Sequence, residues 1–450
     1  MNLFCLTFSK FANIAFGANP EPCNRLTRTL KTSTVSYSTA TVTAQKDIEA
    51  SKPQDAAFHH VGFPDGGLRA WLVVLGAMIV LGCSFGYLSA FGADAGTVYE
   101  THYQQNQLRD KFPSAIAWIG SFQVFCQFAS GLLSGSLFDK YGARAVMIPA
   151  PITYVFAMMM TSLCKEYYQF ILAQGVLGGI DVGFLFTPAV SAINHYFTRK
   201  RGMALGISTG GSSIGGVLFP VALKSTLYSK LGFGWGVRVI AFVERLPHRR
   251  GTLFLPKAFL QLSYTVFTAG IFLTVWGMFV PFFYLSSYAI EQTHFGYTLA
   301  FYLLAIMNDA SLFGRIIPGF VADRIGRMNI FVFVAVATGI IVLCWPKTSS
   351  HPGLVVWAIL FGFFSGAVIS LFPAGFAQIT PNPQMIGTYM GQALAIISIA
   401  GLTGTPIAGA IPDRYGWEAT SIFGGTSLLA GAGLAAMGRF LYNPKLRALV

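Results

Sequence analysis

The chain has 450 residues, of which 54% are hydrophobic and only 10% are charged, whereas soluble domains carry about 25% charged residues. A water-soluble protein of this length has too little interior to bury so much apolar surface, so the composition excludes that class. The net charge of +13 does not indicate nucleic-acid binding, because much of it lies in the N-terminal tail and in short loops between apolar runs, which is typical of membrane orientation.

In chain order, residues 1–68 are polar and rich in Ser and Thr, which predicts a disordered cytoplasmic tail. The rest of the chain is a succession of apolar segments of the length that crosses a bilayer. Twelve are predicted, at residues 71–93, 114–138, 145–163, 168–194, 203–223, 227–243, 258–290, 297–322, 329–346, 353–379, 384–411 and 417–441. We therefore expect an all-α integral membrane protein.

The loops between these segments predict the orientation of the chain. If the tail is cytoplasmic, the inner loops hold more Lys and Arg than the outer loops, including the cluster Arg199–Lys200–Arg201. This bias predicts that both termini are cytoplasmic. The expected organisation is a tail at 1–68, an N-terminal six-helix bundle at 69–243, a short central cytoplasmic loop at 244–257, a C-terminal six-helix bundle at 258–442 and a cytoplasmic tail at 443–450.

The sixth segment is unusually short. It would span roughly 26 Å as a helix, and it carries Lys230 and Arg238. Two interpretations stay open. Either a stretch of chain has been lost here, in evolution or in the gene model, or the bilayer thins locally around a short helix.

Glycine recurs in the fifth segment at Gly202, Gly206 and Gly210, one helical turn apart. Small residues at this spacing remove bulk from one face, so that a neighbouring helix can approach closely, and such packing drives helix association in lipid. Gly206-Ile-Ser-Thr-Gly210 also fits the nucleophile elbow of hydrolases. That motif needs a preceding strand and acid and histidine partners, which an uncharged membrane helix does not supply.

One loop pattern occurs twice, as GSLFDKYGAR at 135–144 and as GFVADRIGR at 319–327. Its glycines allow a helix end to abut a neighbour, and its charges can pair across the cytoplasmic seam between the halves. The repeat predicts two pseudo-symmetric six-helix bundles. The predicted conformational gate consists of Gly135, Asp139, Arg144, Gly319, Asp323, Arg324 and Arg327. The pattern resembles motif A of the major facilitator superfamily.

Two further stretches resemble signatures of the monocarboxylate transporter family, at 65–71 and 196–206, and others resemble its fungal branch. The signature residues are Asp65, Gly66, Trp71, Tyr196, Phe197, Arg199, Arg201 and Gly206. This resemblance implies transport of small organic acids, often with a proton. It also implies that some fungal members accompany secondary-metabolite pathways as presumed exporters.

Ionisable groups inside the predicted membrane segments are candidates for function, because they are costly in lipid. Arg315 is the predicted substrate anchor, since a guanidinium group can hold a carboxylate through two parallel hydrogen bonds. The resemblance implies the same role for a helix-8 arginine, with an aspartate four residues earlier, where this chain has Ser311. Asn308 and Arg238 are further substrate-binding candidates.

Proton coupling is predicted to involve Asp309 or Asp181, since burial in apolar surroundings favours the protonated form of a carboxyl group. Asp309 precedes Arg315 by six residues, which places the two side chains about 120° apart on a helix. They cannot form a pair on one face.

The predicted function is secondary active transport of a monocarboxylate-like organic acid by alternating access, with or without a proton. The alternative is efflux of a secondary-metabolite acid, and the short sixth helix leaves a transport-inactive sensor as a third hypothesis. No enzyme activity, metal or cofactor is expected. The expected partners are an organic anion, a proton and the lipid bilayer, without nucleic acid and with a monomeric transport unit. The plasma membrane is the expected location, and the vacuolar and mitochondrial membranes are the alternatives.

Overall fold

The computed structural model describes residues 66–91, 113–225, 254–348 and 350–444. The described part of Gly62–Val450 is one compact unit of helices, in which no strand occurs. Its α-helices are α2 (Leu68–Phe91), α4 (Pro113–Tyr141), α5 (Ala143–Met147), α6 (Pro149–Leu163), α7 (Tyr167–Phe170), α8 (Gly179–Tyr196), α9 (Arg201–Ser225), α11 (Leu262–Thr293), α12 (Tyr297–Ile325), α13 (Arg327–Leu343), α14 (His351–Ile379), α15 (Ile386–Ala410) and α16 (Pro412–Tyr442).

These helices confirm the prediction of an all-helical membrane protein. Seven spans in the described residues are long and apolar enough to cross a membrane. Every predicted segment except the sixth overlaps a helix, whereas the segment at 227–243 lies outside the described residues. The count of twelve helices and the boundaries of the two bundles therefore stay predictions.

The third and fourth segments are not single straight helices. The third is divided between α5 and α6, where Pro149 occupies the first turn of α6. The fourth consists of α7, a π-helical stretch η1 (Ile171–Gly178) and α8, which contains Pro188. A π-helical stretch and a proline each interrupt the regular hydrogen-bond ladder, so the backbone is irregular on both sides of the first turns of α8.

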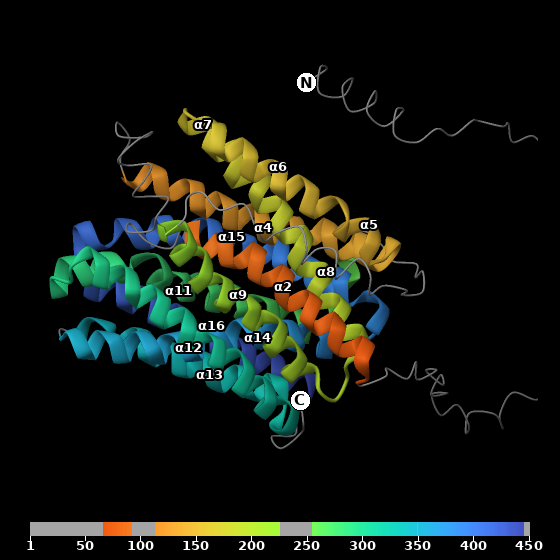
Figure 1. Ribbon diagram of the computed structural model, residues 1–450. Helices are drawn as coiled ribbons and strands as arrows, with labels where there is room; N and C mark the ends of the chain where they lie inside the picture. Colours follow the sequence, from red (N-terminus) through yellow and green to blue (C-terminus); the bar gives the residue numbers. More distant parts are fainter. Residues whose placement is uncertain (1–65, 92–112, 226–253, 349, 445–450) are drawn as a thin grey trace, which may run out of the picture. The chain divides into compact units, whose positions relative to one another are not determined.

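The two halves of the repeat meet along two seams, which we define by their helices. In the first seam α9 packs against α12, and in the second α4 packs against α15. Figure 1 shows α9, in yellow-green, between α2 and α12. α6 lies at the edge of the bundle, and most of its apolar side chains are exposed, as expected where lipid is the solvent.

Glycine makes both seams possible. In the first seam, a Cβ atom on Gly202 would lie 2.5 Å from the carbonyl oxygen of Gly319, and one on Gly206 would overlap the carbonyl oxygen of Arg315. In the second seam, a Cβ on Gly135 would overlap the carbonyl oxygen of Gly387. The close approach predicted from the glycine spacing is thus present between backbones.

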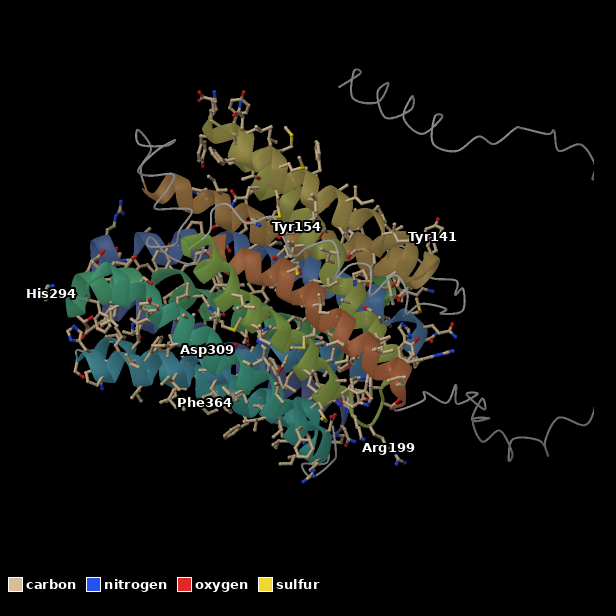
Figure 2. All side chains as sticks on the ribbon, in the orientation of Figure 1. Tyr141, Tyr154, Arg199, His294, Asp309 and Phe364 are labelled. Carbon is tan, nitrogen blue, oxygen red and sulfur yellow. The ribbon has the colours of Figure 1, made fainter. Side chains whose placement is uncertain are left out.

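The second glycine of each copy of the loop pattern is required for a different reason, which is its backbone conformation. Gly142 has φ of 80° and Gly326 has φ of 113°, a region that residues with a Cβ rarely adopt. Each of them follows the last turn of a helix, at α4 and at α12. These loops lie at the end of the bundle where Figure 2 shows Tyr141 and Arg199, and His294 lies at the opposite end.

Candidate functional site

A cavity lies between the two halves of the repeat and contains about 920 Å³ of space free of protein atoms, including its opening to solvent. Seven of the residues that line it are phenylalanines: Phe85, Phe128, Phe186, Phe279, Phe282, Phe283 and Phe372. Its polar side chains are Gln127, Ser212, Asn308 and Arg315. A largely aromatic wall with a few polar groups is the usual composition of a small-molecule site.

Arg315 supplies the positive charge of this cavity. It is 6% exposed, and its guanidinium group crosses the first seam to α9. Its Nη1 donates hydrogen bonds to the carbonyl oxygen of Thr209, at 2.6 Å, and to the hydroxyl group of Ser212. Its Nε donates to Oγ of Ser311, at 3.2 Å. All three acceptors are neutral, so the charge of Arg315 has no carboxylate partner among the described residues.

The sequence prediction did not anticipate these partners. Ser311 stands where the resemblance implies an aspartate, and its hydroxyl group accepts a hydrogen bond from the arginine. Nη2 of Arg315 makes no hydrogen bond within the described chain, which leaves this nitrogen for a ligand. In the sequence, only the recurrence of serine at Ser208 and Ser212, one helical turn apart, marks the α9 side of the contact.

Asn308 also lines the cavity, where its Nδ2 donates to the carbonyl oxygen of Leu304 at 3.0 Å. Its Oδ1 stays available to a ligand donor. Arg238, the third substrate-binding candidate, lies outside the described residues. The structure therefore brings Arg315 and Asn308 together at one cavity.

The two carboxyl groups predicted for proton coupling do not line this cavity. Asp309 is exposed on α12 and shares a face with the exposed Tyr302 and Phe313, between the two ends of the bundle (Figure 2). Asp181 is buried, with 4% of its surface exposed, and its Oδ1 contacts Thr153 of α6. The two groups are thus separate from each other and from Arg315.

The predicted gate residues contact the first turns of helices in the opposite half. Asp323 of α12 accepts hydrogen bonds from the backbone N–H groups of Gly202, at 2.8 Å, and Met203, at 2.9 Å. Asp139 of α4 accepts from the backbone N–H groups of Gly387, at 3.2 Å, and Thr388, at 2.6 Å. A carboxylate at a helix N-terminus satisfies unpaired N–H groups and interacts favourably with the helix dipole.

The cations of the repeated pattern differ in their contacts. Nε of Arg327 lies 3.1 Å from Oδ1 of Asp323, and its Nη2 donates to the carbonyl oxygens of Thr198 and Arg199. Arg324 is exposed and lies over the ring of Phe320, 4.4 Å from its centroid. The side chain of Arg144 lies outside the described residues.

The signature residues hold α2, α8 and α9 together near the same end. The ring of Trp71 packs edge-on against Phe197, with centroids 5.3 Å apart. Arg201 is 5% exposed and donates to the carbonyl oxygens of Phe197, at 3.0 Å, and Asn194, at 3.1 Å. Tyr196 is half-buried and Arg199 is exposed, whereas Asp65 lies outside the described residues. Their contacts are structural and lie away from the cavity.

Comparison with known proteins identifies the class of this protein. The profile of the Major Facilitator Superfamily matches residues 70–348 and 265–449, so the chain belongs to that superfamily. It is 45% identical over 388 residues to the aspyridones efflux protein apdF of Emericella nidulans. The matched residues cover 83% of this chain and 78% of that protein. It is 42% identical to the agnestins efflux protein AgnL12 of Paecilomyces divaricatus, over 81% of this chain and 86% of the relative.

Solved structures agree on the fold. The human organic anion transporter MFSD10 (TETRAN) superposes with a TM-score of 0.63 at 16% identity, over 84% of this chain and all of that chain. FucP in its outward conformation superposes with a TM-score of 0.64 at 15% identity, over 82% of this chain and 98% of that chain. Because the chain belongs to the Major Facilitator Superfamily and its relatives are transporters, it is a transporter and not an enzyme. The relatives support the efflux alternative better than the uptake of a monocarboxylate, and the narrower family resemblance stays a prediction.

Proposed function

We propose that the chain is an efflux carrier for an amphipathic organic anion of secondary metabolism. Two six-helix bundles, at 69–243 and 258–442, would expose the cavity to the two sides of the membrane in turn. Support comes from relatives that are named as efflux proteins and that match more than four fifths of this chain.

The observation that carries this proposal is the single buried guanidinium group in a cavity of phenylalanines. Arg315 supplies the charge and a free nitrogen for an anionic oxygen, and Asn308 supplies an amide oxygen beside it. The phenylalanine rings supply apolar surface for a ring system or a hydrocarbon body. An acid of two or three carbon atoms would leave most of this surface without contact, so the cavity favours the larger metabolite acid.

The gate residues would control access to the cavity. When Asp139 and Asp323 hold the first turns of α15 and α9, both seams are closed at the predicted cytoplasmic end. Loading from the cytoplasm would require these hydrogen bonds to break. We therefore assign the two aspartates to the step that converts one access state into the other.

Binding of a model anion to the purified, liposome-reconstituted carrier tests the substrate class. We expect 2-naphthoate to bind, and we expect its neutral analogue 2-naphthamide and the small anion acetate to bind at least tenfold more weakly. Arg315→Gln should weaken naphthoate binding at least tenfold, since a charge-assisted hydrogen bond contributes about 1.5–3 kcal/mol. Arg414→Gln, which removes an exposed arginine outside both the cavity and the gate, is the matched control and should bind naphthoate like the wild type.

Direction is tested by loading the liposomes or the medium with labelled naphthoate. Binding of acetate in preference to naphthoate, or equal affinity of Arg315→Gln and wild type, would overturn the proposed substrate class. Movement of naphthoate only toward the face of Arg199 would contradict export.

A further inference from the structure

Asp181 is a buried carboxyl group on a face of α8 that the cavity does not use. Its Oδ2 is buried and has no hydrogen-bond partner in the part of the chain that the structure describes, and its Oδ1 lies 2.6 Å from Oγ1 of Thr153 on α6. Phe186, which lines the cavity, follows five residues later on the same helix. At about 100° per residue, the two side chains leave α8 roughly 140° apart. Asp181 is therefore separated from the substrate site by the width of one helix.

Among the described residues, no positive charge compensates this carboxyl group. Neither α6, which covers it, nor η1, which precedes α8, contains Asp, Glu, Lys, Arg or His, and the titratable group on α6 nearest to Thr153 is the phenol of Tyr154. In the described elements that pack on α8, and in α8 itself, the other charged or imidazole groups lie near helix ends. These are Arg69, Asp139, Lys140, His195, Arg201 and His351. The side chains of Arg144 in α5 and Lys224 in α9 lie outside the described residues.

Few hydrogen bonds reach the carboxyl group of Asp181. Oγ1 of Thr153 donates to its Oδ1 at 2.6 Å, and the carbonyl oxygens of Ala150, at 3.0 Å, and Pro149, at 3.2 Å, compete for the same hydroxyl proton. Its Oδ2 has no hydrogen-bond partner among the described residues. An ionised carboxylate here would have one hydrogen bond and no counter-ion, which is costly in an apolar medium.

We propose that Asp181 is the proton-binding site of the carrier, separate from the substrate cavity. It holds a proton while it contacts Thr153, and it releases the proton when α8 moves relative to α6 and water reaches the carboxyl group. The irregular backbone at η1 and at Pro188, on either side of Asp181, permits such a shift without unfolding the helix. This coupling role rests on the proposed export function, in which a proton moving inward would drive the anion outward.

Infrared spectroscopy of the reconstituted full chain tests the proton directly. At neutral pH we expect a carbonyl band of a neutral carboxylic acid that is lost in Asp181→Asn and retained in Asp309→Asn, the matched control. Thr153→Val should retain the band but shift it to the frequency of an acid without this hydrogen bond. Identical spectra for the wild type and Asp181→Asn would overturn the proposal.

Transport of 2-naphthoate tests the coupling. An inward-directed proton gradient should accelerate export by the wild type several-fold, and this acceleration should vanish in Asp181→Asn while exchange of labelled for unlabelled naphthoate at equal pH persists. Full acceleration in Asp181→Asn would show that the coupling site lies elsewhere. If the wild type moves no naphthoate, the proposed function fails, whereas the infrared band still decides the state of Asp181.

Discussion

The two seams use the same device in different surroundings. In each, an aspartate of the repeated pattern accepts two backbone hydrogen bonds from the first turn of a helix in the other half. Asp139 is 4% exposed and also accepts from the hydroxyl group of Thr388, at 2.8 Å. Asp323 is more exposed and pairs with Arg327. Hydrogen bonds are stronger where water is excluded, so the α4–α15 seam should hold more tightly than the α9–α12 seam.

The largest effect is expected from a side chain placed inside a seam. Gly135→Val would put methyl groups where the carbonyl oxygen of Gly387 lies, and overpacking against a backbone atom, which cannot rotate aside, should cost about 3 kcal/mol or more. We expect a longer distance between spin labels at positions 140 and 384 and loss of most transport. Gly433→Val is the matched control, since a Cβ there meets no atom within 4 Å. An unchanged distance in Gly135→Val would refute the close approach.

Removal of one carboxylate charge at a time should show which seam is more stable. Asp139→Asn loses charge-assisted bonds to a helix N-terminus in a buried site and should cost about 3 kcal/mol. The same change at Asp323 should cost about 1 kcal/mol, because the site is wetter. Label distances at 140–384 and at 200–325 report the two seams separately. Equal opening by the two variants would contradict the difference in strength.

The smallest effect is expected at the partly exposed ion pair. Arg327→Gln removes the pair with Asp323, which should contribute less than about 1 kcal/mol. We expect a slight broadening of the 200–325 distance and no change at 140–384. High salt should reproduce only a small part of the change in the wild type, because the side chains of the pair are 13% and 10% exposed and salt screens such pairs weakly. A large effect of Arg327→Gln would mean that the cation, rather than the helix N-terminus, holds this seam.

Much of the gate could be predicted from sequence because it is encoded locally. The repeated pattern places Asp139 and Asp323 at helix ends, and Gly202 and Gly206 predict close packing without knowledge of the neighbour. The residues of the other half that bind these aspartates and glycines, such as Thr388, could not be assigned, because the sequence of one helix does not determine which helix packs against it.

Less of the cavity could be predicted from the sequence. Its phenylalanines come from five helices, from Phe85 to Phe372, and these helices are apolar on all sides, so hydrophobic periodicity does not mark the inner face. Arg315 could be predicted because a single charge in an apolar run stands out. The roles of Asp181 and Asp309 depend on which side of each helix faces lipid. The packing of the helices decides this, because it buries Asp181 against α6 and leaves Asp309 exposed on α12.

The closest approach between the halves is made by main-chain atoms of glycine, whereas the cavity is made of side chains. Apart from Arg315, which lines the cavity and also crosses the first seam, recognition and movement are thus specified by different atoms. Exchange of cavity phenylalanines for other residues should therefore redirect the carrier to new cargo while its conformational cycle is preserved. This separation makes the scaffold suitable for engineering export from production strains.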